Sequence, residues 1–440
     1  MPGYVIVGMQ WGDEGKGKTV DFLTEKADIV VRYQGGNNAG HTVVVNDKET
    51  ILHLIPCGIL HERTTCLIGP GTVIDPAVLL QEIEDLKAAD CEVDGRLHIS
   101  EAAHMIMPYH KIIDGAQERF RGDNKIDTTG RGIGPAYSDK VNRLGIRFGD
   151  FLDADAFRQK LRIALEYKNA LLTRMFDEEP LDYDTVLKEY AAYADRLRAY
   201  SADTVEMLHE AQSEEKMIIF EGAQGAMLDL DHGTFPYVTS STTMSGGVFG
   251  GAGVGPGQID GVIGILKAYS TRVGEGPLPT ELHGDLGERL REAGREYGAT
   301  TGRPRRCGWL DIVPLRRAAK ICGLTHLVLT KSDVLGEFDT LRICTAYEID
   351  GVQTDKFPTV LSQLEKAKPV YEEMPGWKTD ISACKSWEEF PREAQDYISR
   401  IQELVSAPIS VISVGPGRDQ TIVRNDPFGE AIHPVAASRT

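Results

Sequence analysis

The chain has 440 residues, of which 41% are hydrophobic and 26% are charged, which is enough apolar material for a large core. Its formal net charge of −18 at pH 7 and its lack of an extended basic face exclude sequence-independent binding to nucleic acid. No apolar run approaches the roughly 20 residues that cross a bilayer, so we expect neither a nucleic-acid partner nor a membrane. Anionic ligands must then be held by local clusters of cations.

The cysteines and the start of the chain predict a reducing, cytoplasmic compartment. The seven cysteines lack the close paired spacing of zinc sites and redox motifs, so we interpret them as buried thiols. The chain enters a strand at once, without the charged and apolar regions of a signal peptide.

A predicted strand followed by a glycine-rich turn opens the chain. The run Tyr4-Val5-Ile6-Val7 leads to Gly12-Asp13-Glu14-Gly15-Lys16-Gly17-Lys18-Thr19, which also fits the Walker A spacing. Glycines allow backbone N–H groups to face an anion, and Lys16 or Lys18 can meet phosphate oxygens, so the turn predicts a nucleoside triphosphate site. A solvated turn is the plain alternative, but the preceding strand disfavours it. Asp13 and Glu14 would repel phosphate, so each needs another role, such as holding magnesium or taking a proton.

Short apolar runs that end in glycine or polar turns predict an α/β fold with a large, mainly parallel central sheet flanked by helices. These runs are residues 4–7, 29–31, 66–68, 218–220, 263–266, 326–329 and 409–412. No linker, low-complexity tract or repeat divides the chain, so we predict one domain over residues 1–440. Ligands of such sheets bind outside the carboxyl ends of the strands.

A helical insertion is predicted over about residues 153–216. Asp153 is a candidate cap, and apolar positions recur behind it at helical spacing. These positions are Phe157, Leu161, Leu165, Lys168, Leu172 and Met175, then Val186, Tyr190, Ala194 and Leu197. We interpret them as stripes that pack on the core and not as a ligand site.

Glycine-rich and polar segments follow several predicted strands. In residues 34–42, His41 either donates to a phosphate or developing charge, or serves as a surface or capping residue. Residues 128–135 offer hydroxyls and one guanidinium, and they either hold a second phosphate or form a mobile turn. In residues 221–225, Gln224 is placed to hydrogen-bond a base or an oxyanion.

Two later segments carry further recognition chemistry, and one glycine-dense stretch does not. Residues 246–257 lack dinucleotide-binding spacing, so we interpret them as a loop and expect no NAD. Clustered guanidiniums at Arg303, Arg305 and Arg306 suit a carboxylate or phosphate, or form a solvated charge run. Asp333 can accept from both the ring N–H and the amine of guanine, which selects GTP if this segment meets the first glycine-rich turn.

In this order, the segments resemble the adenylosuccinate synthetase family over nearly the whole chain. The stretch Gln10-Trp11-Gly12-Asp13-Glu14-Gly15-Lys16-Gly17 is similar to the N-terminal signature of that family. The stretch Gly132-Ile133-Gly134-Pro135-Ala136-Tyr137, followed by Lys140 and Arg143, is similar to the second signature. Segments around His41, Gln224, Arg303 and Asp333 follow one another in the order expected for that family.

The resemblance implies a GTP-dependent carbon–nitrogen ligase that joins IMP to L-aspartate, the first committed step from IMP to AMP. Adenylosuccinate, GDP and phosphate are released after a 6-phosphoryl-IMP intermediate. Asp13 would take the proton from ring nitrogen 1, so that the 6-oxygen attacks the γ-phosphate. His41 would act as general acid or charge stabiliser toward GDP, Gln224 would steady the purine 6-position, and Lys16 would stabilise the transferring phosphate.

The resemblance also implies the ligand contacts. Magnesium would be held by Asp13 and the carbonyl of Gly40. GTP would contact Gly12, Asp13, Glu14, Gly15, Lys16, Gly17, Lys18, Gly40, His41, Thr42, Arg305, Lys331, Ser332, Asp333, Ser413, Val414 and Gly415. IMP and aspartate would contact Asn38, Ala39, Thr129, Arg143, Gln224, Thr239, Ala299, Thr300, Thr301, Gly302, Arg303, Pro304 and Arg305. Arg143 would come from a second subunit, so a homodimer is expected.

One departure and two alternatives remain. Thr19 completes the Walker spacing where the family usually carries an aliphatic residue, so we assign it no magnesium role. A GTPase switch or nucleotide sensor would use the same turn and guanine reader, but it would not require the further anion sites at Thr129 and Arg303. Another P-loop ligase or kinase would act on a different acceptor.

Overall fold

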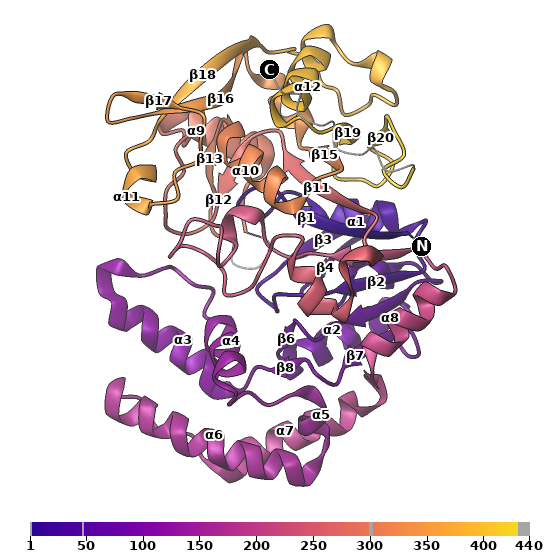
Figure 1. Cartoon of the computed structure of the whole chain (residues 1–440), viewed down its shortest axis with the longest axis vertical. Coiled ribbons are helices and arrows are strands. Elements are labelled where there is room, and N and C mark those ends of the chain that lie inside the picture. The colour runs from indigo at the N-terminus through magenta and orange to yellow at the C-terminus, as the bar shows by residue number, and fades with distance from the viewer. Residues whose placement is uncertain (1, 46–47, 299–301, 430–440) are drawn as a thin grey trace.

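A ten-stranded sheet runs through the middle of the molecule (Figure 1). The computed structural model describes residues 2–45, 48–298 and 302–429. In spatial order the strands are β20 (Thr421–Val423), β19 (Ile409–Ser413), β15 (His326–Thr330), β11 (Gly261–Lys267), β1 (Gly3–Gly8), β10 (Ile218–Glu221), β2 (Ile29–Arg32), β5 (Thr65–Ile68), β7 (Leu97–Ser100) and β9 (Ser201–Ala202). All pairs are parallel except β19 with β20. The predicted α/β fold and its seven apolar strands are confirmed.

Both faces of the sheet are covered, which is why its strands are continuous apolar runs. Side chains alternate along β1, so that Val5 and Val7 pack into the core on one face while Tyr4 and Ile6 pack into the core on the other. All six residues of β1 are buried.

Helices and four small sheets of the described residues surround the central sheet. The helices are α1 (Lys16–Thr24), α2 (Pro76–Ala88), α3 (Pro108–Arg121), α4 (Ile133–Asn142), α5 (Phe148–Leu152), α6 (Ala154–Met175), α7 (Tyr183–Leu197), α8 (Thr204–Ser213), α9 (Gly284–Gly294), α10 (Ile312–Cys322), α11 (Leu361–Leu364) and α12 (Arg392–Val405). The remaining strands are β3 (His41–Val45), β4 (Lys48–Leu52), β6 (Val73–Ile74), β8 (His104–Met105), β12 (Ser270–Arg272), β13 (Arg306–Gly308), β14 (Leu310–Asp311), β16 (Thr340–Ile349), β17 (Val352–Thr354) and β18 (Lys368–Pro375). Helices α3 to α7 gather at one end of the molecule, and β16 to β18 lie with α12 at the other (Figure 1).

The stretch predicted to be helical, residues 153–216, forms α6, α7 and α8. The carboxylate of Asp153 caps α6 by accepting from the backbone N–H groups of Asp155 and Ala156, at 2.9 and 3.0 Å. The predicted stripes are buried except at Met175, which is 53% exposed because it is the last residue of α6 and extends beyond the packed face. The short edge strand β9 within this stretch was not predicted.

Two further expectations are corrected. The stretch 246–257 is not a plain loop, since it contains a π-helical turn at Phe249–Gly253 and a 3-10 turn at Pro256–Gln258. Gly251 permits this close packing, because a Cβ there would lie 2.2 Å from the carbonyl oxygen of Tyr33. Five of the cysteines are buried thiols as predicted, but Cys91 and Cys384 are partly exposed. Across the described residues, no helix has the length and apolar character that a membrane span requires.

Candidate active site

The carboxyl ends of the central strands bring the predicted site segments together. The glycine-rich turn of residues 9–15, here called the phosphate loop, follows β1, and the segment 330–333 follows β15. The hydroxyl of Thr330 donates to the carbonyl of Glu14 at 2.6 Å. The proposed guanine reader therefore meets the phosphate loop, which is the condition the sequence interpretation required.

Three residues of the phosphate loop have left-handed backbone conformations. Gly12 and Gly15 have φ of 88° and 86°, which glycine adopts at no steric cost. Asp13 has φ of 59°, uncommon for a residue with a side chain. Helix α1 then begins at Lys16, so the hydroxyl of Thr19 is already inside the helix and donates to the carbonyl of Gly15 at 3.2 Å. The Walker spacing is thus not matched by Walker geometry.

The side chain of Glu14 braces the loop from within. It is fully buried, and one oxygen accepts from the N–H groups of Gln10 and Gly12, at 3.0 and 2.9 Å. The other oxygen accepts from the ammonium of Lys16 at 2.6 Å. This carboxylate does not stand in the path of an incoming phosphate, as the sequence had suggested, and only the backbone of Glu14 is left for a nucleotide.

Asp13 faces out of the loop and pairs with Arg305. Its carboxylate lies 2.8 Å from Nε of Arg305, whose Nη1 donates to the buried Glu296 at 2.7 Å. Glu296 also accepts from Lys267 at 2.8 Å, and burial, which would raise its pKa, is outweighed by Lys267 and Arg305, so that the pKa falls to about 2. A fixed anion therefore positions Arg305 beside Asp13.

Lys18 turns away from the phosphate loop toward the C-terminal segment 413–420. Its ammonium donates to the hydroxyl of Ser413 and the carbonyl of Gly415, both at 2.6 Å, and to the carbonyl of Gln420 at 3.0 Å. Burial lowers the pKa of Lys18 to about 8. Lys18 thus ties α1 to the segment that contains Ser413, Val414 and Gly415, and its contact with phosphate stays a prediction.

The guanine-reading segment presents an acceptor without a partner. Lys331 donates to the carbonyl of Gly294 at 2.8 Å, and the hydroxyl of Ser332 donates to the carbonyl of Ser413 at 3.2 Å. Oδ1 of Asp333 is buried and has no hydrogen-bond partner among the described residues. Burial raises the pKa of this carboxyl, against the opposing charge of Lys331. An unpaired buried carboxylate oxygen is costly unless a ligand donor meets it.

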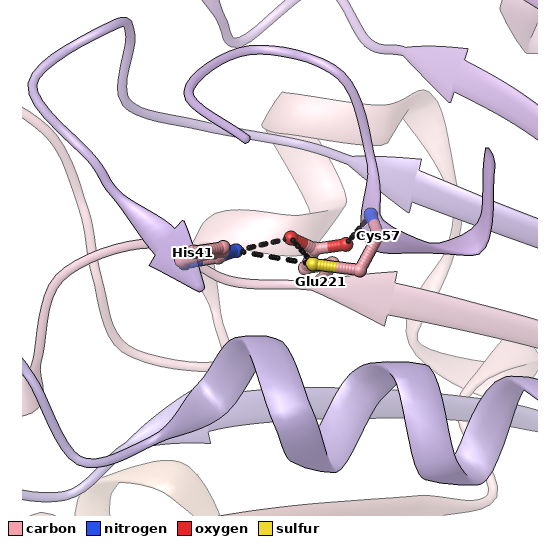
Figure 2. Close-up of side chains that lie close together, drawn as sticks. All are labelled: His41, Cys57 and Glu221. Atoms are coloured by element: carbon pink, nitrogen blue, oxygen red, sulfur yellow. Dashed lines mark hydrogen bonds and ion pairs between the residues drawn. The ribbon is translucent and has the colours of Figure 1, made fainter. Parts of the chain in front are cut away.

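A second group of predicted residues surrounds the start of β3. The amide of Gln224 donates to Asn38 at 3.1 Å, while Oε1 of Gln224 is buried without a partner in the described parts of the chain. Ala39 is buried, and Gly40 and Thr42 are partly exposed on either side of His41. His41 donates from Nδ1 to the buried carboxylate of Glu221 at 2.5 Å (Figure 2).

Other predicted contacts lie on the periphery. Thr129 is exposed, as is Arg143 at the end of α4, whereas Thr239 is partly exposed and donates its N–H to Leu228 at 2.9 Å. Arg303 forms a bidentate pair with Asp127. Gly302 and Pro304 are exposed, and Ala299, Thr300 and Thr301 lie outside the described residues.

Sequence reasoning missed several acids that hold the predicted residues in place. Asp127 pairs with Arg303, 176 residues away in sequence, and Glu296 pairs with Arg305 and with the distant Lys267, so no local pattern marks either acid. Glu221 did carry a signal, because it directly ends a buried strand and opens the segment that contains Gln224. A charged residue at that position requires a partner.

The fold and site together define an α/β nucleotide-binding enzyme with its ligands at the carboxyl edge of a parallel sheet. The adenylosuccinate synthetase family model matches residues 5–422. An adenylosuccinate synthetase from Geotalea daltonii is 55% identical over 429 residues, which is 97% of this chain and 100% of that protein. One from Desulfatibacillum aliphaticivorans is also 55% identical, with the same coverage.

A solved structure of fully ligated adenylosuccinate synthetase from Plasmodium falciparum superposes with a TM-score of 0.90. It is 41% identical and covers 96% of this chain and 99% of its own. The chain belongs to the adenylosuccinate synthetase family.

Proposed function

We propose how the described residues perform the reaction of this family, the GTP-dependent ligation of IMP and L-aspartate to adenylosuccinate. GDP and phosphate are released, and the reaction passes through 6-phosphoryl-IMP in the first committed step of AMP synthesis. One observation carries the assignment of roles: Nε2 of His41, Oε1 of Gln224 and Oδ1 of Asp333 are all buried without a hydrogen-bond partner in the described chain. Buried polar atoms are normally paired, so ligand atoms are the partners we assign to these three.

Asp13 is the base in this proposal. The 6-oxygen of IMP is a poor leaving group and becomes a good one once phosphorylated. A carboxylate that removes the proton from ring nitrogen 1 places negative charge on that oxygen, which then attacks the γ-phosphate. Asp13 is available on the outer side of the phosphate loop, where its carboxylate pairs with Arg305.

Three side chains stabilise the negative charge that develops during phosphoryl transfer. Gln224 hydrogen-bonds the purine 6-position, and His41 stabilises or protonates the departing GDP. Lys16, now held by Glu14, exchanges that partner for the transferring phosphate. Aspartate, once bound by the arginines around 303–305, attacks carbon 6 and expels phosphate.

GTP and IMP are placed by the remaining predicted contacts. Lys331, Ser332 and Asp333 read guanine together with the segment 413–415, and the phosphate loop with Gly40 and Thr42 surrounds the phosphates. Asn38, Thr129, Thr239 and the partner's Arg143 hold the IMP phosphate, so the active unit we propose is a homodimer. We also propose a cytoplasmic location, which the free cysteines support.

Magnesium fits the donor set at the phosphate loop. The carboxylate of Asp13 and the carbonyl of Gly40 are hard oxygen donors of the kind that Mg²⁺ prefers. We propose that these two groups hold it, with phosphate oxygens and water as further ligands. When bound, the ion neutralises charge on the phosphates.

Replacing Asp13 tests the proposal. We expect Asp13→Ala to lower kcat by on the order of 10²–10⁴-fold, the range that general base catalysis supplies, with the melting temperature little changed. Coupled assays of GTP consumption in the presence of IMP and aspartate give kcat, and thermal denaturation monitors the fold. Asp339→Asn, at an exposed acid outside the site, is the control. Activity within tenfold of wild type would remove Asp13 from the role of base.

A further inference from the structure

A buried carboxylate at the carboxyl end of β10 has no role in the reaction described so far. The side chain of Glu221 is 0% exposed and lies next to Arg32, its register partner on β2. Nη1 of Arg32 is 3.8 Å from Oε1 of Glu221, so the charge of each is balanced by the other. Burial alone would raise the pKa of this carboxyl, but the adjoining His41 ring and Arg32 lower it.

Both oxygens of Glu221 accept hydrogen bonds in fixed directions (Figure 2). Oε1 accepts from Nδ1 of His41 at 2.5 Å and from the thiol of Cys57 at 3.4 Å. Oε2 accepts from the backbone N–H of Cys57 at 2.8 Å. The carboxylate is therefore held from both sides, by a strand and by the turn that begins at Cys57.

This arrangement fixes which nitrogen of His41 carries a proton. An ionised carboxylate can only accept, so the hydrogen bond to Glu221 requires the proton on Nδ1. Nε2, on the other side of the ring, is buried and meets no partner in the described chain. The ring lies beside the first turn of α1, where a Cβ on Gly17 would be 3.0 Å from Cβ of His41.

Two other roles for the cluster fit the contacts less well. His41, Cys57 and Glu221 offer ligand atoms that lie within 4.8 Å of one another, as in a metal site. The guanidinium of Arg32 and the N–H of Cys57 already face the carboxylate, and a cation there would meet positive charge. A nucleophilic role for Cys57 is disfavoured because burial, and then Glu221, raise the pKa of its thiol.

We propose that Glu221 is a positioning residue for His41. It accepts from Nδ1 and so holds the ring in one orientation, with Nε2 toward the polyphosphate at the phosphate loop. Its negative charge also opposes the lowering of the His41 pKa by burial, which favours the doubly protonated ring whose Nε2–H can donate to GDP. Arg32 keeps the carboxylate ionised, and the backbone of Cys57 fixes its plane. The inference rests on the proposed role of His41 toward GDP and adds the group that orients it.

Glu221→Gln is the decisive variant. An amide has one acceptor oxygen where the carboxylate has two, so it cannot accept from both His41 and the N–H of Cys57 at their present positions. Outer partners of this kind typically change activity by roughly 10–100-fold. We expect kcat to fall by about that factor while the KM for aspartate changes less than about twofold. Cys57→Ala is the matched control, because it removes the thiol and keeps the N–H, and it should leave kcat within about threefold of wild type.

A double-mutant cycle separates positioning from general destabilisation. If Glu221 acts through His41, adding Glu221→Gln to His41→Asn should produce no further loss of kcat. Additive losses would overturn the proposal, as would a Cys57→Ala variant as impaired as Glu221→Gln. An inactive His41→Asn with a fully active Glu221→Gln would overturn this inference alone. An active His41→Asn would instead overturn the proposed role of His41.

The tautomer can be measured on the wild-type enzyme, whatever the folding of the variants. Enzyme labelled with ¹⁵N-histidine reports the protonation of each ring nitrogen, and His41→Asn identifies the His41 signals. We expect a proton on Nδ1 of His41. A wild-type ring with an unprotonated Nδ1 would overturn the proposal.

Discussion

The side chains of the site differ in whether the chain itself supplies their partners. Lys16 pairs with Glu14 and Arg303 with Asp127, whereas Oδ1 of Asp333 is buried and unpartnered in the described chain. We propose that this oxygen selects the base. Guanine offers a ring N–H and an amine to such an acceptor, while adenine does not. When adenine is bound, that oxygen stays unpaired, and the free-energy cost of the unpaired oxygen favours guanine over adenine.

Asp333→Asn should therefore change the preferred nucleotide. An amide presents a donor where xanthine has a carbonyl, so we expect kcat/KM for GTP to fall by on the order of 100-fold and preference to move toward xanthosine triphosphate. Steady-state assays with each nucleotide measure the ratio. Unchanged preference would remove Asp333 from base recognition.

At the scale of elements, α1 connects the two halves of the nucleotide site. It begins directly after the phosphate loop, and Lys18 on its first turn binds the segment that contains Ser413 and Gly415. The helix also reaches that segment through Asp21, which accepts from Arg418 at 2.7 and 2.8 Å. Guanine and phosphate recognition thus share one rigid body.

Lys18→Met should loosen this connection. Loss of three hydrogen bonds from one cation should raise the KM for GTP by about tenfold, roughly 1.4 kcal/mol, with a smaller effect on the KM for aspartate. Lys26→Met is the control, because Lys26 lies just after α1 and its side chain contacts the exposed Asp426 and the Phe428 ring, away from the segment 413–415. Equal effects of the two substitutions would contradict the connection.

The elements of the sheet could be predicted from sequence, whereas several contacts of the site could not. Runs such as 218–220 and 326–329 are buried on both sides, and their apolar character is local information. Glu296 reaches Lys267 at the end of β11 only through the fold, and Asp127 reaches Arg303 across 176 residues of sequence. The helix start at Lys16 could be predicted, because the strand and glycine-rich turn before it are local signals.

On the scale of the whole molecule, the central sheet joins two large cores. Val5 belongs to one and Tyr4 to the other, so neither core can lose β1 without exposing the second. We propose on this basis that residues 1–440 form one domain. Thermal or denaturant unfolding should then follow one transition with coincident fluorescence and circular dichroism curves. Two separated transitions would contradict a single domain, because they would show that two parts of the chain unfold independently.

The proposed homodimer predicts complementation between defective subunits. Arg143 is exposed at the end of α4, so its guanidinium is available to a partner. Arg143→Leu should be inactive alone, and mixing it with Asp13→Ala should restore about a quarter of wild-type activity, because half of the dimers are hybrids with one intact site. If activity does not recover although the subunits are shown to exchange, that result contradicts a shared site.

The ion pairs among the predicted site residues have a consequence for the binding of other anions. Lys16, Arg303 and Arg305 are each already matched to a carboxylate of the chain, namely Glu14, Asp127 and Asp13. A phosphate or dicarboxylate that binds alone must break such an ion pair. The free energy that it gains from the cation is then largely cancelled by the loss of that pair. We expect that only the complete set of reactants replaces every broken ion pair with a new one. Other anions of the cell should therefore bind weakly.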